Sequence, residues 1–111
     1  MKIQIRQSRP VPVTASEPLY ERVPTADADG KAYSDFMVLI PGIRDLSRDD
    51  FADRVASLQA VLAHYHQVVF ADLNVRLNLL WVTLRPQHGL IPQIAAHLRE
   101  RVPEARLVAH E

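Results

Sequence analysis

The chain has 111 residues, of which 48% are hydrophobic and 23% charged, and its thirteen basic and thirteen acidic side chains leave a net charge of zero. This length and composition fit one globular domain with a single core. Because lysine and arginine are not concentrated anywhere, we expect neither nucleic acid nor a membrane as a partner. The sequence has no cysteine, which excludes disulfides, thiol catalysis and cysteine-ligated metals. No apolar run has the length of a membrane span or of a signal-peptide core, so a cytoplasmic location is expected.

Residues 1–30 are predicted to form a short strand followed by an extended arm. The apolar residues of "KIQIR" alternate with polar ones, as they do in a strand. The arm has no apolar period and contains four prolines, which remove backbone donors and disfavour helix. The strand could pair with an edge of its own sheet or with an edge of a neighbouring subunit. Residues 31–111 are predicted to form the folded α+β domain.

The first strong pattern is a strand followed by a helix. The run "FMVLI" is apolar and ends at Pro41-Gly42, which indicates a buried strand over residues 36–40. Ser47 then has the character of an N-cap, with Asp50 three residues later as in a capping box. One apolar stripe follows at steps of four, three, four and three, and predicts a helix: Phe51, Val55, Leu58, Leu62 and Tyr65.

Two strands are predicted next, because the apolar period falls to two from Val69 onward. This alternation places Asp72 on the outward face of the first strand, as a solvated charge. The phase breaks where Leu79 and Leu80 are adjacent. An unbroken strand here would be about three times the usual length, so a tight turn is expected near "RLNL", with Asn78 in a left-handed conformation.

A second helix and a last strand complete the domain. The helix is indicated by Ile91, Ile94, Leu98 and Val102, with Pro92 tolerated in its first turn, and "ARLVAH" gives the strand. The order of elements predicts a ferredoxin-like βαββαβ sandwich. Its antiparallel sheet has the order 4-1-3-2, two helices cover one face, and the N-terminal strand and arm are additional. The second and fourth strands are then the edges, which invite pairing with another chain.

The stretch "AHYHQVVFAD" raises the question of a metal site. On a helix, His64 and His66 lie about 200° apart around the axis, so they cannot hold one ion unless the chain is already extended there. We therefore interpret them as capping or solvated residues. The predicted topology gathers further polar residues at the same end of the sheet: Asp35, Arg85, His88, His110 and Glu111. Among these residues, only His66 and His88 lie close enough to be metal candidates, and they are weak ones. His97 is expected at the boundary of the second helix's apolar stripe. No resident metal or cofactor is expected.

Pro41-Gly42, which leads from the first strand into the first helix, is the feature in which the chain resembles ACT-type regulatory domains. The resemblance is one of topology over about 75 residues. It implies subunits that associate side by side and a small ligand, often an amino acid, bound between them. The candidate ligand-binding residues are Pro41, Gly42, Arg44, Arg85 and His88.

No activated nucleophile, phosphate loop or motif-bound carboxylate pair is present in the sequence, so no catalytic residue is assigned. We expect a non-catalytic module that binds a small ligand or a protein and works as a homo-oligomer. A two-fold dimer is expected, because it is the commonest form of homo-oligomer. The alternative is a small dimeric α+β barrel-type enzyme with a pocket between sheet and helices. A structural or assembly role is the third interpretation. A cavity between sheet and helices lined by histidine and arginine would favour the enzyme, and a filled core would favour the module.

Overall fold

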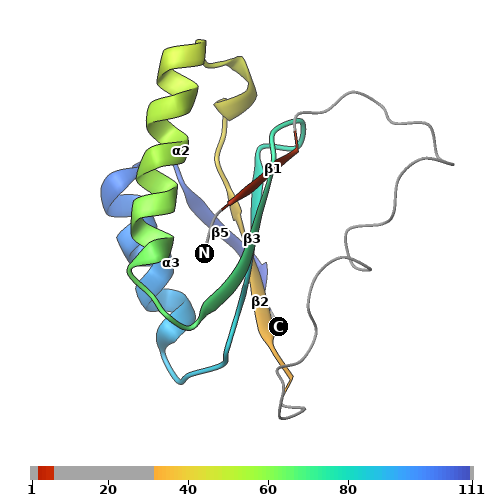
Figure 1. The fold of residues 1–111 in the computed structure, drawn as a ribbon, viewed down its shortest axis with the longest axis vertical. Coiled ribbons are helices and arrows are strands. Elements are labelled where there is room, and N and C mark those ends of the chain that lie inside the picture. The colour runs from red at the N-terminus through yellow and green to blue at the C-terminus, as the bar shows by residue number, and fades with distance from the viewer. Residues whose placement is uncertain (1–2, 7–31, 111) are drawn as a thin grey trace, which may run out of the picture.

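The computed structural model describes residues 3–6 and 32–110. Their elements in chain order are β1 (Gln4–Arg6), β2 (Ser34–Leu39), the short 3-10 helix η2 (Ile43–Asp45), α2 (Arg48–Ala63), β3 (Val68–Asn74), β4 (Leu79–Leu84), α3 (Leu90–Arg101) and β5 (Arg106–His110). This part of the chain has an α+β fold (Figure 1). The predicted extended arm lies outside the described residues. Within the described ranges, no helix is both long and apolar enough to cross a membrane.

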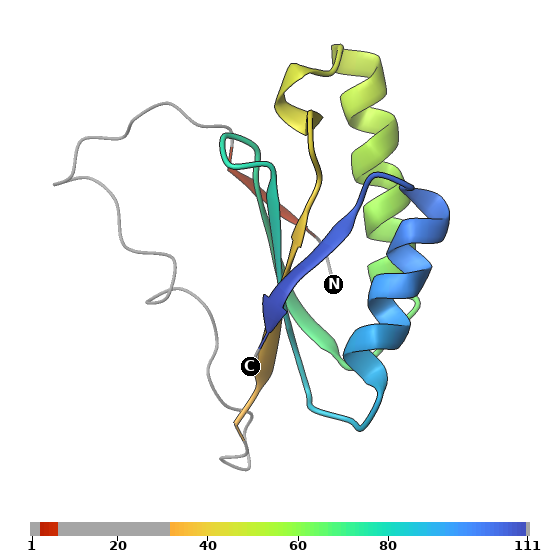
Figure 2. The same ribbon diagram turned by 180° about the vertical axis from the view of Figure 1, so that it is seen from behind.

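The fold has two layers, with α2 and α3 side by side on one face of a five-stranded sheet (Figures 1 and 2). The strand order is β1-β3-β4-β2-β5. The pairs β3/β4, β4/β2 and β2/β5 are antiparallel, whereas β1 is parallel to β3. The three pairings among β2, β3, β4 and β5 are antiparallel, as expected, and the five-stranded sheet is mixed because β1 joins it in parallel.

The N-terminal strand lies on the edge of its own chain's sheet. Gln4 is opposite Asp72 and Arg6 is opposite Asn74. The backbone N–H of Ile3 donates to Oε1 of Gln59 on α2 at 2.7 Å, and the Ile3 side chain is buried. As a result β3 is not an edge, in contrast to the prediction from the sequence, and the outer strands of the described sheet are β1 and β5.

Asp72 is buried, and the prediction that it is a solvated charge is wrong. The alternation of β3 does direct it away from the core side chains Ala71 and Leu73. However, only 1% of Asp72 is exposed, because β1 lies alongside it. Nε of Arg6 donates to its two carboxylate oxygens at 3.2 and 2.9 Å. The local pattern gave the correct face of the strand but could not place the distant strand that covers it.

A filled apolar core lies between the sheet and the helices. Leu58 and Leu62 of the predicted stripe are fully buried on α2, and Phe51 and Val55 are half-buried. Tyr65, the last residue of the stripe, is also half-buried but lies two residues beyond the end of α2. Other large buried side chains of this layer come from β2 and the residue after it, β3, β4 and α3: Phe36, Val38, Ile40, Leu73, Leu80, Val82, Leu84, Ile94 and Leu98. Burial of this apolar surface is the main force that holds the helices on the sheet.

The start and end of α2 follow local rules. Oγ of Ser47 accepts a hydrogen bond from the backbone N–H of Asp50 at 3.1 Å, which confirms the predicted N-cap. The helix ends at Ala63, with His64 as its C-cap in a right-handed conformation. The backbone N–H of Val68 then donates to the carbonyl of Tyr65 at 3.1 Å, so a turn and not an extended segment connects α2 to β3.

Candidate functional site

The candidate ligand-binding residues fall at two opposite ends of the sheet. Because β2 and β4 are antiparallel, with Ser34 opposite Leu84 and Leu39 opposite Leu79, the segments that follow their C-termini point in opposite directions. Pro41, Gly42 and Arg44 belong to one end, and Arg85 and His88 belong to the other. The structure does not bring the five residues together. We call residues 40–46 and 75–78 the turn end, and residues 64–67 and 85–89 the histidine end.

Hydrogen bonds within the fold use several polar groups of the turn end. Asn78 has φ 55°, which confirms the predicted left-handed turn. Its carbonyl accepts from the N–H of Ile40 at 2.7 Å, and its Oδ1 accepts from the N–H of Arg44 at 3.1 Å. The Arg44 side chain donates to the carbonyl of Arg76 at 3.3 Å. Gly42 has φ 80°, a conformation that glycine adopts without strain. These residues therefore join two loops of the fold.

The histidine end is made by two loops that are tied to each other. The N–H of Arg85 donates to the carbonyl of Gln67 at 2.8 Å, and Nε2 of Gln67 donates to Oε1 of Gln87, also at 2.8 Å. These bonds hold the loop that carries His88 against Gln67, the residue that directly precedes β3. Arg85, Gln87 and His88 remain exposed, so this end presents polar side chains to solvent on a fixed backbone.

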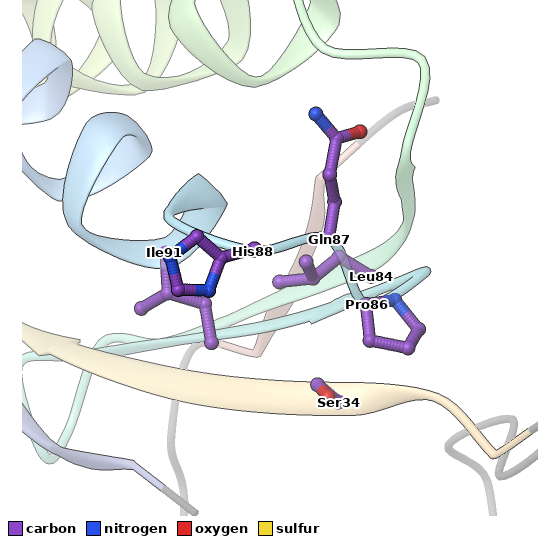
Figure 3. Close-up of a pocket in the computed structure, with 6 residues that line it drawn as sticks. All are labelled: Ser34, Leu84, Pro86, Gln87, His88 and Ile91. Atoms are coloured by element: carbon purple, nitrogen blue, oxygen red, sulfur yellow. The ribbon is translucent and has the colours of Figure 1, made fainter.

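A hollow of about 340 Å³ opens at the histidine end. Figure 3 shows Ser34 of β2 on one side of it and His88 and Ile91 on the other. Leu84, Pro86 and Gln87 complete its lining. The volume is at the lower end of the range of small-molecule sites, about 300 to 1,000 Å³. Apolar walls with one hydroxyl and one imidazole can hold a small molecule that has an apolar part and a polar group.

Among the histidines, the structure pairs His64 with His97 and not with His66. The ring centroids of His64 and His97 are 5.7 Å apart, and Oη of Tyr65 lies 3.0 Å from Nδ1 of His97. His97 is half-buried, as predicted for a boundary residue, while His66 and His88 are exposed. Within residues 3–6 and 32–110, no three histidine, aspartate or glutamate side chains form a cluster suited to a metal ion.

The sequence could have indicated the contact between His64 and His97. Tyr65 belongs to the apolar stripe of the first helix, and His97 borders that of the second. Two helices that cover the same face of a sheet must lie beside each other, so residues at the borders of their stripes can meet. The apolar stripes do not show how far one helix is shifted along the other, because that shift depends on the packing of the whole core.

The sheet face opposite the helices carries two polar atoms that the sequence did not single out. Nε1 of Trp81 and Oγ1 of Thr83 are buried and have no hydrogen-bond partner within the described part of the chain. Both residues lie on β4, the middle strand, where Trp81 is opposite Met37 and Thr83 is opposite Asp35. In the described ranges no helix covers this face (Figure 2).

Comparison with known proteins finds no relative: no family model, no curated protein and no solved structure matches the chain.

Proposed function

We propose that the chain is a non-catalytic binding module that takes a small ligand in the hollow beside His88 and works as a homodimer. The observation that carries this proposal is the position of the hollow. It lies at the end of the sheet, next to exposed polar side chains on a fixed loop, and not between the sheet and the helices. A site there can bind and release a ligand without opening the core.

The filled core favours a binding module over a barrel-type enzyme. An enzyme of that kind would hold its substrate in a pocket between sheet and helices, among side chains such as histidine and arginine. Here the same layer contains apolar side chains such as Leu58, Leu73 and Ile94, none of them exposed. Reactive groups placed there would have to be desolvated without partners, which is costly.

The lining of the hollow suggests the class of ligand. Leu84, Pro86 and Ile91 provide apolar walls, while Ser34 and His88 provide hydrogen bonds. Arg85 lies between the lining residues Leu84 and Pro86 and is exposed. Helix α3 starts at Leu90, so the positive end of its dipole is near His88. We propose a small carboxylate with an apolar side chain, of which free amino acids are the commonest examples.

The arrangement of the domain supports this class of module. The strands from β2 onward have the order β3-β4-β2-β5 with antiparallel pairings, and both helices lie on one face. We infer a ferredoxin-like arrangement that β1 extends by one strand, with the regulatory role that the ACT-type resemblance implies. Pro41, Gly42 and Arg44 do not belong to the proposed site, because they lie at the turn end and the hollow lies at the opposite end of the sheet.

The proposed dimer forms through β5. This strand ends the described sheet, and its two large apolar residues, Leu107 and Val108, are more than a third exposed. An unpaired edge without a central charge or proline invites pairing with another strand. Two copies related by a two-fold axis would pair their β5 strands antiparallel and continue the sheet.

Calorimetric titration with a panel of amino acids and short carboxylates tests the ligand. We expect saturable binding of at least one member, and at least a tenfold loss of affinity in His88→Ala. His66→Ala is the matched control, because His66 is an exposed histidine of the same end that does not line the hollow. Equal losses in both variants, or a loss in His66→Ala alone, would contradict the site.

Light scattering at micromolar concentration tests the dimer, which should have about twice the chain mass of 12.6 kDa. Val108→Lys places a charge on the proposed edge and should give the monomer mass. Leu77→Lys is the control, because Leu77 is an exposed apolar residue at the turn end. A monomer at all concentrations for the unmodified chain would reject the dimer.

A further inference from the structure

We propose that His64 and His97 form a binding site for a divalent transition-metal cation such as Zn²⁺ or Cu²⁺, between α2 and α3. His64 is the C-cap of α2, and His97 lies in the second half of α3. The two helices lie side by side on the sheet (Figures 1 and 2). Neither residue lines the hollow beside His88, so this site is separate from the proposed ligand site.

The distance between the two rings fits a shared ion. A zinc–nitrogen bond is about 2.0 to 2.1 Å long, so two imidazoles on one ion have centroids roughly 4.5 Å apart at a right angle and roughly 6.4 Å apart in line. The observed separation of 5.7 Å lies between these limits, and the ring planes are 82° apart. To share an ion, the two rings would turn so that a nitrogen of each faces the same point.

Tyr65 orients His97 for this role. Its Oη is 3.0 Å from Nδ1 of His97, and it can accept a hydrogen bond from a protonated Nδ1. In that tautomer the lone pair is on Nε2, the nitrogen that is free to bind a metal. A ligating histidine usually has its other nitrogen hydrogen-bonded in this way, which sets both its tautomer and its orientation. The ring of Tyr65 also contacts the His64 ring, with centroids 5.2 Å apart.

The environment of His64 suits a cation. The C-terminus of a helix carries a partial negative charge, and the last turn of the 16-residue α2 contains no basic side chain to neutralise it. His64 is exposed, so water molecules can fill the remaining coordination positions. Because the described residues offer no third ligand to the pair, we expect micromolar and not nanomolar affinity.

Calorimetric titration of the full, untagged chain with ZnCl₂ and with CuCl₂ tests the site. We expect one ion per chain and tighter binding of Cu²⁺ than of Zn²⁺, in accordance with the general order of metal affinities. His64→Ala should abolish saturable binding, and because His64 is exposed the variant should fold normally. His66→Ala and His88→Ala are matched controls, since they remove exposed histidines of the same end, and both should bind as the unmodified chain does.

Tyr65→Phe tests the orienting hydrogen bond. It removes the hydroxyl but keeps the ring, and should weaken metal binding by about 10-fold to 100-fold, the usual effect of losing such a partner. Circular dichroism of each variant checks that it is folded. The proposal is overturned if zinc and copper show no saturable binding up to millimolar concentration. It is also overturned if His64→Ala binds as the unmodified chain does, or if binding is lost in His66→Ala or His88→Ala instead.

Discussion

The two ends of the sheet contain similar residues and use them differently. At the turn end, Arg44 and Asn78 form hydrogen bonds with each other or with neighbouring backbone. At the histidine end, Arg85 and His88 extend from a loop that other bonds already hold. A polar residue in a loop is therefore not a functional candidate by its type alone. What distinguishes the two ends is whether the fold itself uses the polar group.

This difference separates two kinds of substitution. Changes at turn-end residues whose polar groups or backbone conformation the fold uses, or in the core that supports both ends, should lower stability and leave binding intact in the protein that is still folded. Changes at the histidine end should lower binding and leave stability nearly unchanged. The following predictions are ordered by the expected loss of stability.

Leu58→Ala should have the largest effect. Leu58 is fully buried between α2 and the sheet, and a leucine-to-alanine change at such a site costs about 2 to 5 kcal/mol of unfolding free energy. Urea denaturation followed by circular dichroism measures it. Leu77→Ala is the control and should change stability by less than about 0.5 kcal/mol, because 55% of Leu77 is exposed. A loss below about 0.5 kcal/mol in Leu58→Ala would mean that the helix face is wrongly assigned.

Arg6→Ala should have the next largest effect, because it leaves the buried carboxylate of Asp72 without its cation. Removal of one partner of a buried ion pair costs about 3 to 5 kcal/mol. We expect about 2 to 3 kcal/mol, since the Arg6 side chain is 32% exposed and water can replace part of the interaction. Arg85→Ala, an arginine of the histidine end, should cost less than about 0.5 kcal/mol. Equal losses for the two arginines in urea denaturation would mean that the ion pair with Asp72 does not stabilise the fold.

Asn78→Ala should cost about 1 to 2 kcal/mol, because alanine is strained at the observed φ of 55°. The change also removes the side-chain oxygen that accepts from the N–H of Arg44. Asn78→Gly removes the same oxygen but adopts positive φ without strain, so it should cost less than Asn78→Ala. Thermal denaturation of the two variants measures the difference, and the reverse order of stability would contradict the strain argument.

His88→Ala should have the smallest effect on stability, within about 0.5 kcal/mol, because the side chain is exposed. Thermal denaturation without ligand measures this, and the calorimetric titration described above measures the loss of binding. A large loss of stability would place His88 among the residues that hold the fold.

Features with local causes could be predicted from the sequence. The N-cap at Ser47 and the left-handed turn at Asn78 each depend on a few neighbouring residues, and both are as expected. The stripe through Leu58 and Leu62 faces the core for the same reason. In each case the residues that determine the local structure are close to one another in the sequence.

Features that join distant segments could not be predicted. Asp72 is buried because Arg6 lies beside it, although 66 residues separate them in the sequence. The contact between His64 and His97 depends on how α3 is positioned along α2. The five candidate ligand residues were grouped by a resemblance, and the antiparallel register of β2 and β4 separates them. The alternation and spacing of apolar residues specify which face of a strand or helix a residue occupies. They do not specify the distance between residues on different elements, so none of these three features could be predicted.

The most direct test of the account is native mass spectrometry of the protein as purified from cells, in three forms: unmodified, His88→Ala and Arg44→Ala. Both substitutions remove an exposed side chain of one candidate ligand residue, one at each end of the sheet. We expect a small ligand that the unmodified protein retains to be retained also by Arg44→Ala and to be lost from His88→Ala. A ligand lost from Arg44→Ala and retained by His88→Ala would place the binding site at the turn end and contradict the proposed site.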